Sequence, residues 1–340
     1  MRIAIDRNSI DAVKDDNEYI YLFSNETLEE LLKTNLHCIY YENCSFVDIN
    51  LTDYNVDCIK KAKITDKDFD YLPPKTDYKI AIIIPNYNYE EWIEKCLKSI
   101  LNQTYKNYEI IFVDDMSIDN SVAVAKKLLK PPNKVIELKQ KRLNGGARNE
   151  AYLYLSDDVD YIWYVDSDDW LKDEYVLEKI NQRLQMKPDV LFVGWAFYQD
   201  GVEATAFIPE YKDRYDAMQG WSGSCGKVIK KELATKQECL YHEGTLKEDK
   251  NQHYKICIYM KDFALLKSPI YVWNKTNTKS VTTVRENIAW KTSTIRHYAD
   301  TLQLYLSVKG NDPRTDALLE KRVRLTKREM ESGGDAQWWN

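Results

Sequence analysis

The sequence lacks a long apolar segment. In its 340 residues, no run approaches the roughly 18 apolar residues that a membrane-spanning helix needs. The opening stretch, MRIAIDRNSIDAVKDD, is charged early and has no apolar core of the kind that signal peptides carry. We therefore expect a cytoplasmic protein with no transmembrane segment, either soluble or peripheral to the inner face of a membrane.

The cysteine patterns of a disulfide framework or a zinc site are also missing. The count of seven is odd, the positions are scattered, and no CxxC pair occurs. The cysteines are Cys38, Cys44, Cys58, Cys96, Cys225, Cys239 and Cys257. This usage favours reduced thiols in a cytosolic protein.

Excess positive charge, internal repeats and low-complexity segments are absent as well. Lys and Arg number 48 against 54 Asp and Glu, and the net charge of −6 argues against a broad nucleic-acid-binding surface. Aromatic residues, in contrast, are plentiful, with 25 Tyr and 9 Trp. Such residues suit sheet positions and carbohydrate-stacking surfaces, and for any single one we favour the core.

Residues 1–75 differ in pattern from the rest of the chain. RIAID, YIYLFS and HCIYYENCSFVDI are typical of short strands, and Asn25 is a candidate N-cap for a helix through ETLEELLKT. Pro73 and Pro74 prevent a helix or sheet from continuing. We predict a small α/β accessory unit over 1–75.

From residue 76 the pattern alternates between strand and helix. Continuous apolar runs predict strands that are buried on both faces, and helical spacing of apolar residues predicts the helices between them. The predicted strands are 79–85, 108–115, 134–139 and 161–165, and the helices are YEEWIEKCLKSILNQ, 120–130 and 146–156. This alternation predicts a doubly wound parallel sheet.

The last part of the chain is more varied. The predicted elements are a strand with an extension or hairpin at 189–201, a turn-forming segment at 221–232, a helix from near Glu248, a strand and loop at 268–283, and helices at 287–308 and 313–331. Asp312 can cap the last helix, and Pro313 suits its first turn. We therefore predict a main domain over 76–285 and a helical C-terminal extension over 286–340.

Polar clusters directly follow three of the predicted strands. They are Pro85-Asn86-Tyr87-Asn88, Asp114-Asp115 and Asp166-Ser167-Asp168-Asp169. In open α/β sheets, ligands bind beyond the carboxyl ends of the strands. We expect all three clusters to line one rim and to form a site there.

The crowded carboxylates of DSDDW can be explained in two ways. In the simpler one, Asp168 or Asp169 caps a following helix and the others are solvated. An EF-hand is excluded by the missing Gly at the sixth position, and a DxDGT phosphatase motif by Trp170. In the functional one, Asp166 and Asp168 hold Mg²⁺ or Mn²⁺, which prefer oxygen ligands and would offset the repulsion.

The succession of motifs favours the functional explanation. In order, IIIPNYN, VDDMSID, NGGARN, YVDSDDW and KED resemble the motifs of family 2 glycosyltransferases, over about residues 78–285. The resemblance implies a GT-A fold, which is a Rossmann-like, mixed and mostly parallel sheet with flanking helices. It also implies an inverting reaction that uses a nucleotide-diphosphate sugar.

The resemblance assigns roles to residues of the first motifs. Pro85, Tyr87 and Asn88 would face the base and ribose of the donor, and Asp114 or Asp115 would accept a hydrogen bond from the base or ribose. A carboxylate suits the imide N–H of uracil, so a UDP-sugar is the expected donor. Arg148 would lie in the nucleotide pocket and balance these carboxylates.

The later motifs would carry the chemistry. Asp166, with Ser167, would contact the donor, and Asp166 and Asp168 would bind Mn²⁺ or Mg²⁺, with Asp168 the favoured direct ligand. In the Glu248-Asp249 pair, Asp249 would be the general base that takes the proton of an acceptor hydroxyl. The acceptor could be a glycan, a cell-surface polymer, a protein or a modified nucleobase.

Two positions depart from the family pattern. Met116 stands where a Gly is usual after the paired aspartates, which is tolerable if its φ stays negative. Glu150 stands where a small residue is more common. Neither change removes a catalytic group. Two alternative functions also stay open: a non-catalytic module that binds sugar nucleotides or glycans, and a nucleotidyltransferase acting on a sugar phosphate. IIIPNYN lacks the Gly-rich basic loop of the latter.

Further candidates are weaker. Lys227 either flanks the acceptor or is an ordinary exposed lysine, and His253 is interpreted as structural, with approach to the metal or acceptor as the alternative. Trp221 is a candidate for stacking on an acceptor ring, whereas Trp195 is expected in the core. Trp273 and Lys279-Ser280 resemble a late segment that touches the donor diphosphate. Three basic residues of the last helix are expected to be solvated, with membrane-surface contact as the alternative: Lys321, Arg324 and Arg328.

Overall fold

The computed structural model describes residues 76–277 and 288–332, together with five short strands in the first 75 residues. The chain divides into two compact units, one of Met1–Asp77 with Lys179–Met186 and one of Tyr78–Glu178 with Lys187–Asn340. The limits predicted for the main domain and the extension stay predictions.

In the first unit the strands are β1 (Arg2–Ala4), β2 (Tyr19–Tyr21), β3 (His37–Cys38), β4 (Val47–Asp48) and β5 (Asp57–Cys58). Strand β1 pairs with β2 in parallel and with β4 antiparallel, and β3 pairs with β5 in parallel. Four of these strands lie within the three segments that the sequence predicted. The helix predicted after Asn25 lies outside the described residues.

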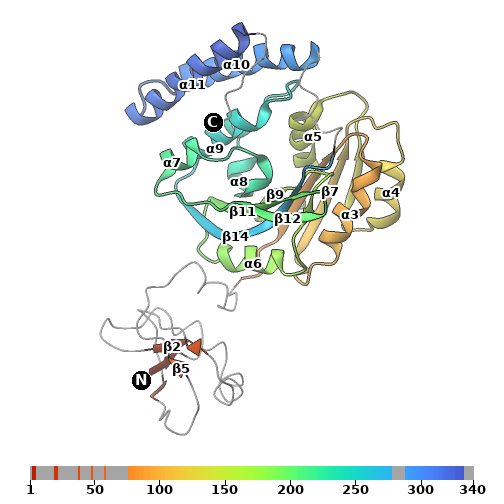
Figure 1. The fold of residues 1–340 in the computed structure, drawn as a ribbon, viewed down its shortest axis with the longest axis vertical. Helices are drawn as coiled ribbons and strands as arrows, with labels where there is room; N and C mark the ends of the chain where they lie inside the picture. The colour runs from red at the N-terminus through yellow and green to blue at the C-terminus, as the bar shows by residue number, and fades with distance from the viewer. Residues whose placement is uncertain are drawn as a thin grey trace. The chain divides into compact units, whose positions relative to one another are not determined.

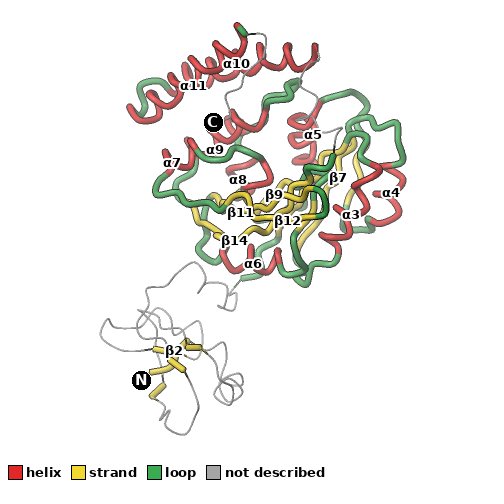
Figure 2. Tube along the Cα trace, viewed as in Figure 1, coloured by secondary structure: helices red, strands yellow, loops and turns green. Residues whose placement is uncertain are grey.

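The second unit is built on a nine-stranded sheet (Figure 2). Its strands are β6 (Ile80–Asn86), β7 (Tyr108–Asp114), β8 (Lys134–Glu137), β9 (Tyr161–Tyr164), β10 (Trp170–Leu171), β11 (Val190–Gln199), β12 (Val202–Phe207), β13 (Lys227–Lys230) and β14 (Phe263–Asn274). The order is β10-β14-β11-β13-β9-β6-β7-β8, and β12 pairs with β11. Strands β6, β7, β8, β9, β11 and β14 share one direction, and β10, β12 and β13 run against them.

This sheet is mixed and mostly parallel, as the family resemblance implied, and not parallel throughout as the strand–helix alternation predicted. The main reason is β13, which lies antiparallel between β9 and β11. The sequence predicted turns in this Gly-rich segment. Val228 and Ile229 are fully buried there, and their burial between two strands outweighs the turn signals around them.

The helices described after residue 76 lie mostly where helical periodicity predicted them (Figure 1). They are α3 (Glu90–Leu101), α4 (Ser121–Leu128), α5 (Leu143–Ala151), α6 (Val176–Leu184), α7 (Arg214–Gln219), α8 (Lys231–Ala234), α9 (Glu248–Tyr259), α10 (Ile288–Val308) and α11 (Pro313–Glu331). Short 3-10 turns are η3 (Tyr152–Tyr154), η4 (Ser224–Gly226) and η5 (Gln237–Cys239). The predicted cap of α11 is confirmed, because the Asp312 side chain accepts hydrogen bonds from the backbone of Arg314 and Thr315. None of the helices described is long and apolar enough to cross a membrane.

The main core forms where α5, α7, α8 and α9 cover one face of the sheet. Ala81 and Ile83 of β6 pack in one cluster with Ala147 of α5 and Ile256 of α9. Strand periodicity sends alternate residues of β6, which are also fully buried, to the opposite face. A strand buried on both faces needs the continuous apolar sequence that Ile80–Asn86 has.

Polar contacts join the C-terminal helices to α9, and Figure 1 shows α10 and α11 side by side beyond it. The Asn251 side chain donates to Asp300 Oδ2 at 2.7 Å, and Thr301 Oγ1 donates to Asn251 Oδ1 at 3.0 Å. Lys247 pairs with Glu329 of α11. These contacts fix the helix that begins at Glu248.

His253 is a core residue, as the sequence analysis favoured. Its side chain is fully buried, and Nε2 donates to the carbonyl oxygen of Ala217 at 2.8 Å. Burial, followed by the charge of Lys227, lowers the pKa of His253 from 6.5 to about 3.

We predict that replacing Leu191 with Ala lowers the free energy of unfolding by about 3 kcal/mol. Leu191 is fully buried in β11 between β13 and β14, so truncation leaves a cavity. Urea unfolding followed by tryptophan fluorescence measures the loss. Leu306→Ala is the matched control, because Leu306 is 63% exposed. Equal effects of the two changes would contradict this description of the core.

We also predict that His253 makes the protein less stable in mild acid. The unfolded chain takes up the proton below pH 6.5, whereas the folded chain resists protonation until about pH 3. Stability therefore falls as the pH drops through this window, by about 1 kcal/mol between pH 7 and 5.5. Urea unfolding of the wild type and His253→Gln at both pH values tests this, and an unchanged pH dependence in the variant would refute it.

Candidate active site

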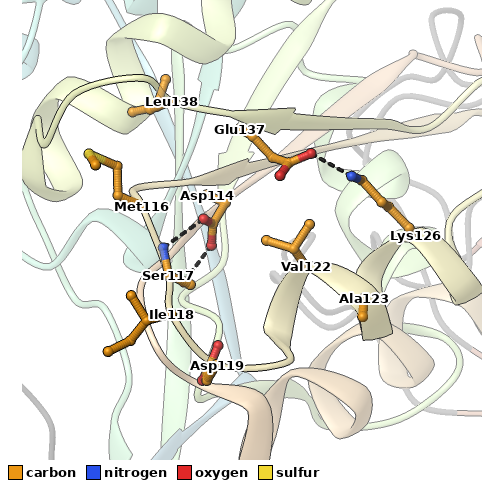
Figure 3. A pocket seen from close by; sticks show the side chains of 10 residues that line it. All are labelled: Asp114, Met116, Ser117, Ile118, Asp119, Val122, Ala123, Lys126, Glu137 and Leu138. Atoms are coloured by element: carbon orange, nitrogen blue, oxygen red, sulfur yellow. Dashed lines mark hydrogen bonds and ion pairs between the residues drawn. The ribbon is translucent and has the colours of Figure 1, made fainter.

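Asp114 joins the two polar clusters that follow β6 and β7. Its Oδ1 accepts a hydrogen bond from Asn86 Nδ2 at 2.9 Å, and its Oδ2 accepts one from the backbone N–H of Ser117 at 2.8 Å. Asp114 is 3% exposed. The carboxylate thus closes the turn after β7 (Figure 3). Through Asn86 it also ties this turn to the end of β6.

Asp115 points to a different partner, the start of α5. It accepts hydrogen bonds from the backbone N–H groups of Arg142 at 2.7 Å and Leu143 at 2.9 Å. Lys141 Nζ lies 3.6 Å from its Oδ2 and above the ring of Tyr87. A carboxylate that satisfies free N–H groups at a helix start is stabilised by the helix dipole. Contact of either aspartate with a nucleoside stays a prediction.

The other residues of the first loop differ in exposure. Pro85 is buried within β6, whereas Tyr87 is 42% exposed and Asn88 is intermediate. An open groove with a volume of about 580 Å³ adjoins Asp114 (Figure 3). Its lining is Asp114, Met116, Ser117, Ile118, Asp119, Val122, Ala123, Lys126, Glu137 and Leu138.

The condition under which Met116 would be tolerated, a negative φ, is not met, since φ is +66°. The chain must reverse here within three residues so that Ser117 can reach Asp114. The side chain is 46% exposed, so the left-handed backbone brings no collision in the core. Such a conformation costs a non-glycine residue on the order of 1 kcal/mol.

The capping interpretation of the acidic loop is also wrong, because strand β10 follows and not a helix. Asp169 accepts hydrogen bonds from the Tyr271 hydroxyl and from the backbone of Asn274 at 2.8 Å, so it ties the loop to β14. Burial and the charge of Asp166 raise the pKa of Asp168 to about 6. The repulsion among these carboxylates is therefore only partly relieved within the chain.

Arg148 joins the acidic loop to the start of α9. Its Nη2 donates to Asp166 Oδ1 at 2.8 Å, and its Nη1 donates to Glu248 Oε1 at 2.9 Å and to Asp249 Oδ1 at 3.2 Å. The sequence analysis expected Arg148 to balance the carboxylates after β7. Its position on the inner side of α5 directs the guanidinium to these three acidic groups instead.

The two carboxylates of α9 have different environments. The Glu248 side chain is 5% exposed, whereas that of Asp249 is 39% exposed. Burial, and after it the charge of Asp249, raises the pKa of Glu248 to about 8. Glu248 is thus a buried partner of Arg148, and Asp249 is the carboxylate that solutes can reach.

Asp166 and Asp168 fit a divalent cation. Asp166 engages Arg148 through Oδ1 and Asp168 accepts from Asn277 through Oδ2 at 2.7 Å, so each keeps a second oxygen for a ligand. Ser167 Oγ, between them, is buried and has no hydrogen-bond partner among the residues that the structure describes. Within the described residues no group of three His, Cys, Asp or Glu is placed to hold a metal. The chain would supply two carboxylates and leave the other positions to water and phosphate, as Mg²⁺ sites commonly do.

Two residues near Asp249 escaped the sequence analysis. Ser224 Oγ donates to Asp249 Oδ1 at 2.5 Å and accepts from the Tyr241 hydroxyl at 2.7 Å. Only the Gly-rich composition of WSGSCGK signalled a special loop here. Lys227 is fully buried and is not the exposed lysine that the sequence analysis considered.

The remaining candidates are three tryptophans, two residues outside the described part of the chain and three basic residues of α11. Trp195 is 8% exposed, as expected for the core, and its ring centroid lies 4.9 Å from that of Trp221 and 5.5 Å from that of Trp273. Lys279 and Ser280 are not described. The basic residues expected to be solvated on α11 are exposed: Lys321, Arg324 and Arg328.

Known proteins resemble this chain in sequence. Glycosyltransferase GlyG of Streptococcus pneumoniae is 27% identical over 231 residues, which cover 62% of this chain and 75% of GlyG. Glycosyltransferase GlyA of the same organism is 36% identical over 115 residues, 34% of this chain and 16% of GlyA. The poly(ribitol-phosphate) beta-glucosyltransferase of Bacillus spizizenii is 37% identical over 117 residues, 33% of this chain and 18% of that protein. The chain thus spans less than a fifth of the last two relatives.

The fold is also found among solved structures. The crystal structure of S. aureus TarS in complex with UDP-GlcNAc matches with a TM-score of 0.59 and 18% identity, over 74% of this chain and 73% of that one. This likeness shows a GT-A type fold. The model of "Glycosyl transferase family 2" matches residues 81–269. The match covers more than half of the 340 residues, and the chain belongs to glycosyl transferase family 2.

Proposed function

We propose that this enzyme transfers a sugar from a nucleoside-diphosphate donor of the UDP type to an acceptor hydroxyl, with inversion at the sugar carbon. The observation that carries the proposal is the meeting of Asp166 and Asp249 at Arg148. It brings the end of β9 and the start of α9 to one guanidinium. Family membership favours this reaction over a non-catalytic binding module or a nucleotidyltransferase.

Asp249 is the proposed general base. Its partial exposure allows an acceptor hydroxyl to approach within hydrogen-bond distance, and a base must have this access to take the proton. Arg148 holds the carboxylate in place from the buried side, and Glu248 pairs with the same guanidinium. A base on one face of the sugar and a diphosphate leaving on the other give inversion in a single displacement.

Asp166 and Asp168 are the proposed ligands of Mn²⁺ or Mg²⁺. When bound, the cation would neutralise charge on the departing diphosphate. Ser167, whose buried hydroxyl finds no partner in the described part of the chain, is proposed to donate a hydrogen bond to the nucleotide sugar at the same place. Asp168 is fixed by Asn277, so one ligand is oriented by the chain itself.

The donor base is proposed to lie at the first two loops. Tyr87 and Asn88 can contact the base and ribose, with Pro85 beneath them, and Asp114 or Asp115 can accept from the imide N–H of uracil. TarS, which shares the fold, was crystallised with UDP-GlcNAc and with UDP. This supports a uridine donor.

The proposed acceptor is a hydroxyl of a glycan or cell-surface polymer. The relative from Bacillus spizizenii is named a poly(ribitol-phosphate) beta-glucosyltransferase, which supports a polymer over a protein or a modified nucleobase. The enzyme is proposed to work in the cytoplasm or at the inner face of a membrane, where donor nucleotides are made.

We predict that Asp249→Asn lowers UDP release by about 100-fold or more, because an amide cannot accept the acceptor proton. UDP release is measured with UDP-glucose and UDP-N-acetylglucosamine, with water as acceptor, and UDP affinity is measured by calorimetry. Affinity should stay within about threefold, since the charge removed is not on the proposed donor-binding loops. Asp157→Asn, at an exposed aspartate, is the matched control. Near-normal turnover of Asp249→Asn would reject the base.

We predict that removal of divalent metal with a chelator abolishes UDP release and that added Mn²⁺ or Mg²⁺ restores it. Asp168→Asn should weaken Mn²⁺ binding by about tenfold or more, because one of two anionic ligands is lost. Electron paramagnetic resonance of free Mn²⁺ measures binding without relying on activity. Unchanged turnover after rigorous metal removal, or equal Mn²⁺ affinity of the variant, would contradict the proposed site.

A further inference from the structure

Asp249 receives two hydrogen bonds on one oxygen. Ser224 Oγ donates to its Oδ1 at 2.5 Å, and Arg148 Nη1 donates to the same atom at 3.2 Å. Ser224 is 2% exposed, whereas the side chain of Asp249, which it contacts, is 39% exposed. A carboxylate held through one oxygen has a defined direction for the other.

Tyr241 holds Ser224 in the donating orientation. Its hydroxyl donates to Ser224 Oγ at 2.7 Å, so the serine proton is left to point at Asp249. The Tyr241 ring is fixed by Tyr164, with centroids 5.5 Å apart, and by the guanidinium of Arg148, 5.2 Å from the ring centroid. Burial raises the pKa of Tyr241 well above its ordinary value, which keeps this donor protonated.

The loop that presents Ser224 is built around Lys227 and Trp221. The buried ammonium of Lys227 donates to the carbonyl oxygens of Ser222 at 2.9 Å and Gly223 at 2.7 Å. The indole of Trp221 packs so closely on Gly223 that a Cβ there would collide with the ring. Burying a lysine is costly unless its donors are paired. The loop therefore has one well-defined conformation.

The same packing explains Trp221. A Cβ at Gly226 would also collide with its indole, and the ring of Trp195 covers another side. This packing makes the partly buried ring part of the loop structure. Ser224 thus stands on a rigid support, between an aromatic cluster and the start of α9.

We propose that Ser224 and Tyr241 are positioning residues that aim the free oxygen of Asp249 at the acceptor hydroxyl. This rests on the proposed function, in which Asp249 is the base. In the step they serve, the acceptor proton passes to Asp249 Oδ2 while the acceptor oxygen bonds to the sugar carbon. The bond from that carbon to the diphosphate breaks, and its electron pair leaves with UDP. Neither positioning residue gains or loses a proton.

The test compares Ser224→Ala and Tyr241→Phe with the wild type, using UDP release from UDP-glucose and UDP-N-acetylglucosamine. Loss of a hydrogen bond to a charged group predicts a fall in kcat of about 10- to 100-fold for Ser224→Ala. Tyr241→Phe should lose less, because the serine hydroxyl remains. The donor KM and the UDP affinity should stay within about twofold, because Ser224 and Tyr241 act on the proposed base and not on the proposed donor-binding loops.

A double variant sharpens the comparison. If the two residues act as one relay, Tyr241→Phe adds little to the loss already caused by Ser224→Ala, whereas independent effects would multiply. Ser307→Ala and Tyr175→Phe are matched controls at exposed positions and should leave kcat unchanged. If Ser224→Ala does not fold, Tyr241→Phe decides the outcome alone, since it keeps the buried ring.

The possible results separate this inference from the proposed function. If Asp249→Asn is inactive but Ser224→Ala and Tyr241→Phe keep the wild-type kcat, positioning is overturned and the base stands. If kcat, KM and UDP affinity all worsen together, the residues support the fold in general and the proposal fails. If Asp249→Asn remains active, the proposed function itself fails.

Discussion

The active-site region depends on the ion pairs of a single buried guanidinium. Arg148 is 1% exposed and contacts Asp166, Glu248 and Asp249. A buried charge without partners destabilises a protein by several kcal/mol, so folding that buries Arg148 also brings these acidic residues to it. Helix α5, strand β9 and helix α9 are thereby joined at one point, although 101 residues separate Arg148 from Asp249.

Exposure divides the acidic residues of the rim into two kinds. Asp114, Asp115 and Asp169 are almost fully buried, and each is occupied by backbone N–H groups or neighbouring side chains. Asp166 and Asp249 are about one-third exposed in their side chains. The first kind shapes the loops, and the second kind remains open to solutes. Asp168 belongs to neither group, because it is 7% exposed and yet is a proposed metal ligand. In these aspartate-rich motifs, some carboxylates therefore hold the loops in place, and others are left for chemistry.

Much of this arrangement followed from the sequence because it depends on local patterns. Apolar runs located β6, β7 and β9, helical periodicity located α3 near its observed limits, and the start predicted for a helix near Glu248 is confirmed by α9. The rule that ligands bind at the carboxyl ends of strands brought the three polar clusters to one rim. The clusters are far apart along the chain, but the topology of the sheet alone decides whether they meet.

The parts that sequence reasoning missed depend on tertiary contacts. The burial of Lys227 and the strand β13 both require neighbours that no local window contains. Ser224 and Tyr241 are ordinary residues until folding places them beside Asp249. Capping by Asp168 or Asp169 was one of two explanations left by the sequence, because the partners of Asp169, Tyr271 and Asn274, lie more than 100 residues away.

Met116 has a consequence for how this enzyme could change over generations. Its left-handed backbone stores on the order of 1 kcal/mol, yet its side chain is 46% exposed, and it directly follows Asp114 and Asp115. Glycine would release that strain without disturbing Asp114 or Asp115. Met116→Gly would therefore raise the free energy of unfolding. The protein could then tolerate substitutions elsewhere that are useful but destabilising.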